Sequence, residues 1–278
     1  MTAPDHDITT APDADFLALM QKITRERGFG CASYKEKCLR RRIAVRMRAR
    51  AVHTYADYAR VLDHDAREYD LLLDALTINV TKLFRNWETF ASIERHVIPA
   101  LWARPDSTID VWSAGCASGE EPYSLAILFH RYAAARGELQ ALSRVSVVGT
   151  DIDRASLAAA ERAHYADAAF ADTPDELRGA YFSADAPFTP RADIRAMVRF
   201  QRRDLLRESP PAPRLHLIAC RNVIIYFDRQ TQEALFRRFQ EALVPGGFLV
   251  LGKVETLLGA PRSGFVAIDP RERIFRRL

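Results

Sequence analysis

Two different spacings of apolar residues divide the chain. Between residues 14 and 90, apolar residues recur every three or four positions and never alternate with polar ones. This spacing predicts amphipathic helices. The helices expected in this part span Asp15–Arg27, Tyr34–Arg50, Thr54–Asp63 and Arg67–Leu76. A further helix, Phe90–Arg104, leads out of this part and ends before Pro105.

From residue 107 short apolar runs alternate with helical patterns. Such alternation predicts a mostly parallel sheet with helices on both faces. The strands expected lie at residues 107–113, 145–151, 197–201, 214–220 and 247–252, with a closing pair near 265–268 and 272–277. The helices expected lie at residues 120–136, 153–163 and 228–243.

These patterns predict the domain organisation. We expect a disordered tail at 1–13, a helical domain at 14–90, a linker helix at 91–106 and an α/β sheet domain at 107–278. Residues 164–196 interrupt the alternation with three prolines and a short helix near 174–180, which indicates an inserted subdomain.

The turn after the first strand is the most informative stretch of the chain. Residues 113–119 are all small, and they lie between a predicted strand and a predicted helix. Gly115 and Gly119 have no side chain, so the backbone can approach a ligand closely there. Asp151 ends the second strand, where a carboxylate can accept hydrogen bonds from a ribose diol. The pattern therefore favours a nucleoside cofactor.

Two acids at the start of the next helix narrow the choice of cofactor. The turn lacks the Gly-x-Gly-x-x-Gly spacing of dinucleotide sites and the lysine of nucleotide triphosphatase loops. Glu120 and Glu121 would repel a pyrophosphate at the helix N-terminus. They suit a cofactor with a cationic amino-acid end, such as S-adenosylmethionine. The alternative, that both acids only complement the helix dipole, stays open.

Polar residues follow the fourth strand at its carboxyl end. Arg221, Asn222 and Tyr226 come directly after the apolar run Leu217–Cys220. Ligands bind at this edge of open α/β sheets, so these residues are candidates for the site. In the alternative, Asn222 only turns the chain and Tyr226 packs in the core. Asp204 and Leu205, after the third strand, are weaker candidates for contact with an adenine.

A second polar group lies among apolar residues before the linker helix. Asn79, Thr81 and Arg85 lie among Ile78, Val80 and other apolar residues in the segment 76–87. A turn with a helix cap at Thr81 is the alternative to a functional site there.

The charge is unevenly distributed, although the net charge of the 278 residues is only +4. The segment 34–50 carries eight basic residues against one acid, among them Arg40, Arg42, Arg46 and Arg50. Such a helix is either a solvated face or a docking surface for nucleic acid or an acidic protein. The four cysteines and seven histidines show no metal-binding spacing. This spacing predicts a protein without a metal. No secretion signal or membrane-spanning run is recognisable, so we also expect a cytoplasmic protein.

Four motifs in order resemble the chemotaxis receptor methyltransferases of the CheR type. They are Leu-Thr-x-Asn-x-Thr-x-x-Phe-Arg at 76–85, Val-Trp-Ser-Ala-x-x-Ala-Ser-Gly-Glu-Glu-Pro-Tyr-Ser at 111–124, Gly-Thr-Asp-Ile-Asp at 149–153 and Cys-Arg-Asn-Val-x-Ile-Tyr-Phe at 220–227. The resemblance implies a Rossmann-like class I methyltransferase that uses S-adenosylmethionine to esterify glutamate side chains of chemoreceptors.

The resemblance also implies roles for individual residues. Asn79, Thr81 and Arg85 would line the site from the helical domain, Glu121 would meet the methionine part of the cofactor and Asp151 its ribose. Asp204 and Leu205 would flank the adenine, and Arg221 and Asn222 would complete the pocket. Tyr226 would lie with Arg85 near the reacting methyl group. The arginine-rich helix, with Arg40, Arg42, Arg46 and Arg50, would meet an acidic receptor helix.

Two departures from the family pattern affect these expectations. The segment 182–191 has no glycine, whereas members that tether to a receptor's C-terminal pentapeptide carry a glycine-rich loop there. We therefore expect the protein to find its receptor without this tether. Separately, we expect a monomer. Lys253 stands where the family usually has a small polar residue. The competing hypotheses are a nucleic-acid methyltransferase and a regulatory module that binds cofactor without turnover.

Overall fold

The chain forms two units. The structure, a computed structural model, describes residues 14–77 and 81–278, which divide into units Met1–Ile78 and Asn79–Leu278. The helical unit therefore ends earlier than the expected boundary at residue 90. The reason is that Leu83, Phe84 and Phe90 are buried in the core of the second unit. The expected tail at 1–13 lies outside the described residues.

The first unit consists of four helices around their own core. They are α1 (Ala14–Arg27), α2 (Glu36–Ala49), α3 (Tyr55–His64) and α4 (Ala66–Leu76). A short 3-10 turn at Cys31–Ser33 precedes α2, which begins at Glu36 instead of Tyr34. Thr54 and Asp65 cap α3 and α4 by accepting hydrogen bonds from backbone amides three residues later. The four predicted helices are confirmed.

The second unit is built on a seven-stranded sheet. Its strands are β1 (Ile109–Ala114), β2 (Val145–Asp151), β3 (Val198–Arg202), β4 (Leu215–Cys220), β5 (Leu243–Leu251), β6 (Phe265–Asp269) and β7 (Ile274–Arg277). Their order is β3-β2-β1-β4-β5-β7-β6. The first five strands are parallel, and the β6–β7 hairpin joins β5 in antiparallel fashion. This is the predicted α/β fold.

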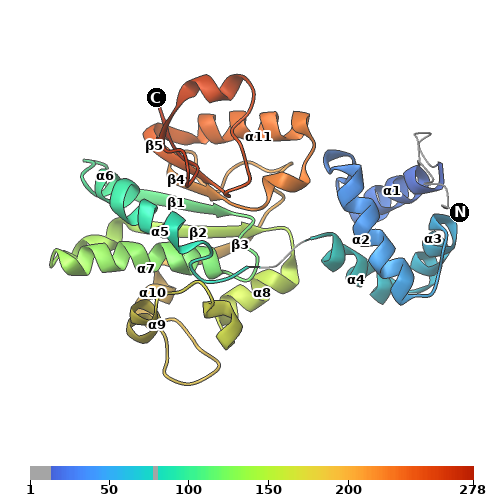
Figure 1. Ribbon diagram of the computed structural model, residues 1–278, viewed down its shortest axis with the longest axis horizontal. Helices are drawn as coiled ribbons and strands as arrows, with labels where there is room; N and C mark the ends of the chain where they lie inside the picture. The colour runs from blue at the N-terminus through green and yellow to red at the C-terminus, as the bar shows by residue number, and fades with distance from the viewer. Residues whose placement is uncertain (1–13, 78–80) are drawn as a thin grey trace, which may run out of the picture. The chain divides into compact units, whose positions relative to one another are not determined.

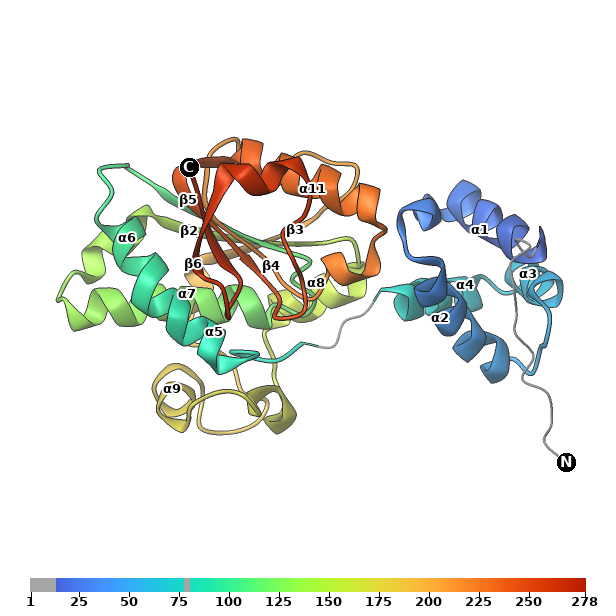
Figure 2. The same cartoon turned by 45° about the horizontal axis from the view of Figure 1, so that its top comes forward.

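Helices cover both faces of the sheet. In Figures 1 and 2, α11 (Arg229–Ala242) lies on one face, and α7 (Glu120–Ala135) and α8 (Arg154–Arg162) lie on the other. The linker becomes α5 (Trp87–Ser92), a π turn (Ile93–Val97) and α6 (Ile98–Trp102), which pack beside α7. Because β1 and β4 are neighbours whose chains leave to opposite faces, the sheet has its topological switch point between them.

The inserted segment 164–196 packs on aromatic rings. It contains α9 (Asp175–Tyr181) and α10 (Ala192–Ala196), the second of which was not predicted. The Arg178 guanidinium lies over the rings of Phe170 and Phe188, at 4.7 and 4.4 Å from their centroids. Within this fully described segment, β pairing is limited to isolated bridges at Tyr165–Phe188 and Phe182–Pro190.

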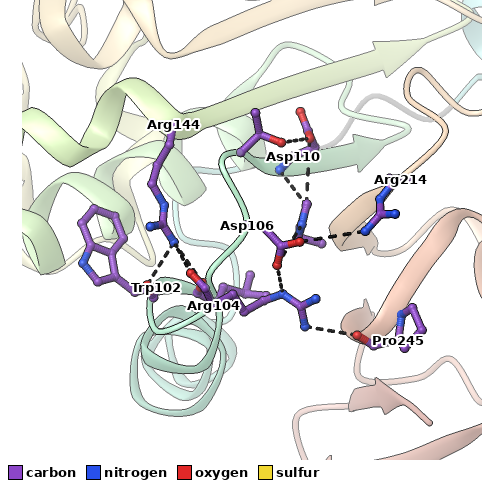
Figure 3. Close-up of polar contacts among 10 residues, drawn as sticks. Trp102, Arg104, Asp106, Asp110, Arg144, Arg214 and Pro245 are labelled. Carbon is purple, nitrogen blue, oxygen red and sulfur yellow. Dashed lines mark hydrogen bonds and ion pairs between the residues drawn. The ribbon is translucent and has the colours of Figure 1, made fainter.

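Ion pairs fasten the amino edge of the sheet. Figure 3 shows Asp106, in the loop before β1, between Arg104 and Arg214. Arg104 Nε donates to Asp106 Oδ2 at 2.6 Å, and Arg104 Nη1 donates to the Pro245 carbonyl at 3.1 Å. His216, on β4, is buried and accepts a hydrogen bond at Nδ1 from the Asp110 amide at 3.0 Å. This cluster joins β1, β4 and β5 at the edge opposite the candidate site.

Candidate functional site

The turn between β1 and α7 is shaped by packing as well as by its positive φ angles. Gly115 has φ +77°, and a Cβ there would lie 2.5 Å from Val223 Cγ2. Gly119 has φ +90°, and a Cβ there would lie 2.9 Å from the Ala160 Cβ. The two glycines are therefore required by neighbouring protein atoms, whereas the sequence suggested only close approach of a ligand.

Asp151 holds this turn against the end of β2. Its Oδ2 accepts a hydrogen bond from the Ala117 amide at 2.9 Å, and its Oδ1 accepts one from the Asp153 amide at 3.0 Å. Burial raises the pKa of the Asp151 carboxyl, although these backbone amides oppose the shift. The carboxylate thus lies at the carboxyl end of β2, beside the small-residue turn. Its contact with a ribose stays a prediction.

Glu121 and Arg221 form a buried ion pair across the switch point. Arg221 Nη1 lies 3.3 Å from Glu121 Oε2, and the two side chains are 2% and 12% exposed. Ser113 Oγ, at the end of β1, donates to Glu121 Oε1 at 2.8 Å. Residues from β1, α7 and the end of β4 therefore meet at one point, as their sequence positions predicted.

Arg221 also brings the segment before α5 to this edge. Its Nη2 donates to the Arg85 carbonyl oxygen at 2.6 Å. The Phe84 amide donates to Ser124 Oγ at 2.9 Å, which fixes the same segment to α7. Arg85 and Thr81 thus belong to the second unit, whereas the sequence led us to expect them in the helical domain. Asn79 lies outside the described residues.

The two acids that open α7 differ from each other. Glu120 is 5% exposed, and Ser118 Oγ donates to its carboxylate at 2.9 and 3.0 Å. Burial raises the pKa of Glu120. Glu121 is instead paired with Arg221. Because each acid has its own polar partner, complementing the helix dipole is not the whole role of either.

Asn222 and Tyr226 lie on the loop that follows β4. Asn222 adopts a left-handed conformation with φ 62°, and Tyr226 ends the 3-10 turn Ile224–Tyr226. Among the described residues, the Asn222 Oδ1 atom has no hydrogen-bond partner although it is buried. A buried acceptor of this kind is normally satisfied by a ligand group or by an ordered water molecule. The loop therefore fits a polar cofactor at the switch point.

The loop after β3 is held by a residue that the sequence did not single out. Arg238, on α11, donates to the carbonyl oxygens of Leu205 and Leu206 at 2.8 and 3.0 Å. Asp204 Oδ1 accepts a hydrogen bond from the Leu206 amide at 2.8 Å. Arg238 was missed because its partners are backbone carbonyls, which leave no charge pattern in the sequence.

Lys253 links the end of β5 to two other elements. Its Nζ lies 3.2 Å from Glu88 Oε2 on α5 and 3.4 Å from Glu272 Oε1 in the β6–β7 turn. The unusual lysine therefore joins carboxylates of two elements at this edge of the sheet.

The four arginines expected to dock a receptor all make contacts inside the helical unit. Arg42 Nη1 donates to the Ala75 and Leu76 carbonyls at the end of α4, at 2.9 and 3.0 Å. Arg46 is paired with the fully buried Glu68. The remaining two pair with acids: Arg40 with Glu36 at 2.6 Å and Arg50 with Asp65 at 3.0 Å.

A different set of basic residues lies on the solvent face of α2. Lys37, Arg41 and Arg48 are exposed, and their spacing puts them on one side of the helix. The buried residues Leu39 and Ile43 lie on the other side. The sequence could have separated the two sets, because helical periodicity places Arg42 and Arg46 towards the apolar face.

The described residues contain no cluster of three or more histidine, cysteine or acidic side chains arranged to bind a metal. No helix in residues 14–77 and 81–278 is long and apolar enough to cross a membrane.

Comparisons with known proteins match both units. Residues 79–268 match the family model "CheR methyltransferase, SAM binding domain", and residues 14–77 match "CheR methyltransferase, all-alpha domain". A chemotaxis protein methyltransferase of Listeria innocua is 30% identical over 92% of this chain and 95% of its own length. One of Klebsiella aerogenes is 33% identical over 91% of this chain and 87% of its own length.

A longer relative also matches. An uncharacterized 104.1 kDa protein in the hypE 3' region of Rhodobacter capsulatus is 35% identical over 88% of this chain. The chain spans 26% of the length of that relative.

Proposed function

The chain belongs to the CheR methyltransferase family and is an S-adenosylmethionine-dependent methyltransferase, and we propose that it esterifies glutamate side chains of chemoreceptors. The observation that carries this proposal is the meeting of Glu121, Arg221 and the Arg85 segment at the switch point of the sheet. The motifs that define the resemblance thus converge on the edge where α/β sheets bind ligands.

The chain's own residues suggest how each part of the cofactor is held. Glu121 would accept the cationic amino-acid end, with Arg221 keeping the Glu121 carboxylate in place. Asp151 would bind the ribose, and the Asp204–Leu205 turn would flank the adenine. Asn222 would accept a hydrogen bond from the cofactor at its Oδ1 atom, which has no partner among the described residues. Asn79 and Thr81 would complete the pocket. When bound, S-adenosylmethionine supplies an electrophilic methyl group.

The chemistry asks little of the protein in proton transfer. A glutamate side chain has a pKa of about 4.3, so the substrate is already an anion at neutral pH. The protein's task is then to align this carboxylate and to exclude water. We assign the alignment to Arg85, which can hold a carboxylate through paired donors. Tyr226 would border the reacting group through its ring or its hydroxyl group.

Receptor docking on α2 requires a revised set of residues. Because Arg42 and Arg46 serve the helical unit internally, we propose that Lys37, Arg41 and Arg48 meet the acidic receptor helix. Exposed charges of one sign raise the rate of association with an oppositely charged partner and make that rate sensitive to salt.

The inserted segment supports recognition without a pentapeptide tether. Strand addition needs a free strand edge with regularly spaced backbone donors and acceptors. Residues 164–196 offer only isolated bridges, and the segment 182–191 has no glycine. We therefore propose that a free receptor pentapeptide does not bind. Calorimetry with the pentapeptide tests this, and micromolar binding would overturn it.

A labelling experiment tests the proposed function as a whole. The protein is incubated with radiolabelled S-adenosylmethionine and receptor cytoplasmic fragments, and the receptor is then treated with mild base. Glutamate esters release the label as methanol, whereas methylated nucleic acid or lysine retains it.

We further propose that the enzyme acts as a monomer in the cytoplasm, where such receptor helices lie. Light scattering of the purified protein tests its oligomeric state.

A further inference from the structure

Glu255 is a buried carboxylate that the described residues pair with no cation. Its residue is 3% exposed, and its oxygens accept hydrogen bonds from three backbone amides. Oε2 accepts from Gly252 at 2.6 Å and from Asn222 at 3.0 Å, and Oε1 accepts from Ile225 at 3.2 Å. Burying a carboxylate is costly unless it is hydrogen-bonded. Here the Glu255 carboxylate accepts hydrogen bonds from amides of the loop that follows β4.

The same loop is also held through its carbonyl groups. Gln232, on α11, is 8% exposed. Its Nε2 donates to the carbonyl oxygens of Ile224 and Phe227, both at 3.0 Å. Glu255 therefore binds the amides of the loop and Gln232 binds its carbonyls. Together they replace the regular hydrogen bonds that a helix or strand would supply.

The end of β5 approaches this loop too closely for a side chain. A Cβ at Gly252 would lie 2.8 Å from Glu255 Oε2 and 2.9 Å from the Asn222 amide nitrogen. The contact explains how one carboxylate reaches both backbones at once. It also shows that the position of Asn222 is fixed from the β5 side.

We propose that Glu255, with Gln232, is a positioning residue that fixes the loop carrying Asn222 and Tyr226 for methyl transfer. This inference rests on the proposed function for the role of Tyr226, but not for the hydrogen bonds. Glu255 does not touch the reacting groups, so it acts through the loop. Misplacement of a reacting group by about 1 Å costs up to roughly 100-fold in rate.

The test compares Glu255→Gln with a matched change elsewhere in the same unit. Glutamine has the same shape, but its amide nitrogen would face an N–H donor. The control is Glu138→Gln, which alters a carboxylate that accepts the Trp102 indole N–H at 2.6 Å. Gln232→Met removes the carbonyl-side donors and provides a second variant if Glu255→Gln does not fold.

Three measurements are made on the full chain. For Glu255→Gln we expect faster amide hydrogen exchange confined to residues 221–227 and weaker S-adenosylhomocysteine binding. The kcat for receptor methylation should fall roughly tenfold or more, with the KM for the receptor unchanged. Glu138→Gln should leave all three as in the wild type.

Other outcomes separate the two claims. Faster exchange with unchanged kcat and cofactor affinity would reduce Glu255 to a stabilising contact, and exchange raised throughout the unit would also overturn its positioning role. If the wild type methylates no receptor, the proposed function fails. The positioning role is then judged by hydrogen exchange and cofactor affinity alone. If both stay as in the wild type, the positioning role of Glu255 is refuted.

Discussion

Arg46 binds Glu68 through two hydrogen bonds, from Nε to Oε1 at 3.0 Å and from Nη2 to Oε2 at 2.7 Å. The Glu68 side chain has no exposed surface, whereas that of Arg46 is 20% exposed. The Tyr58 hydroxyl donates to the same carboxylate at 2.7 Å. Helices α2, α3 and α4 are thus joined by one buried charge, and an arginine expected to bind a receptor stabilises the fold.

Replacing Arg46 by alanine should destabilise the helical unit. The change leaves the buried Glu68 carboxylate with its main cation removed, which costs about 3 kcal/mol. All three tryptophans lie in the second unit. We therefore expect part of the helical circular dichroism signal to be lost at a lower urea concentration than in the wild type. The urea midpoint followed by tryptophan fluorescence should not change. Arg48→Ala, at an exposed position, is the control. An unaltered dichroism transition for Arg46→Ala would show that the pair adds no stability.

Reversing charge on the solvent face of α2 should impair receptor methylation. We expect Arg41→Glu with Arg48→Glu to slow methylation of a receptor fragment roughly tenfold at low salt, because steering is lost. S-adenosylhomocysteine affinity should not change. The matched control reverses Arg60 and Arg67, two exposed arginines on α3 and α4. Equal effects of the two double variants would mean that net charge, not the α2 face, governs docking.

Removing the Asp151 carboxylate should weaken cofactor binding. Hydrogen bonds to a charged acceptor contribute about 1.5–3 kcal/mol, so Asp151→Ala should raise the dissociation constant of S-adenosylhomocysteine roughly tenfold or more. Calorimetry measures this, with Asp185→Ala in an exposed loop as control. An unchanged affinity would refute the ribose assignment.

His216 should make the second unit less stable in mild acid. Burial lowers its pKa, although the neighbouring Asp106 and Asp110 oppose the shift. Below about pH 6.5 the unfolded chain then binds the proton more tightly than the folded one, so stability falls as the pH falls. His216→Asn keeps an acceptor for the Asp110 amide but does not titrate.

The measurement is the free energy of unfolding, followed by tryptophan fluorescence between about pH 7 and about pH 5. We expect a shallower fall with pH for His216→Asn than for the wild type. His164→Asn, at an exposed position, should resemble the wild type. Equal slopes for His216→Asn and the wild type would show that His216 does not set the pH dependence.

The strands and most helices followed from apolar spacing because these elements bury continuous faces. The residues 145–151 were predicted and found as β2 without any change of bounds. By contrast, β5 begins at Leu243 rather than at residue 247. Pro245 and Gly246 obscured its start, since both residues are uncommon inside strands. The boundary near residue 90 was wrong because Leu83 and Phe84 look the same in sequence whichever core buries them.

The candidate site shows the same division between local and distant information. Glu121 and Arg221 were predicted as site residues because each follows a strand at the carboxyl edge of the sheet, and the structure brings their side chains together. The roles of Arg46, Arg238 and Glu255 depend on partners far along the chain or on backbone groups. A charged residue in a sequence does not reveal whether its partner is solvent, another protein or a buried amide.

Ester formation on receptor glutamates is the central claim, and mass spectrometry of a receptor fragment tests it most directly. After incubation with the enzyme and S-adenosylmethionine, we expect glutamate side chains in the receptor's helical region to gain the mass of one methylene group. This gain should disappear after mild base, because an ester hydrolyses and a methylated amine does not. A modification that resists base, or a receptor that stays unmodified while the enzyme methylates nucleic acid, would contradict the claim.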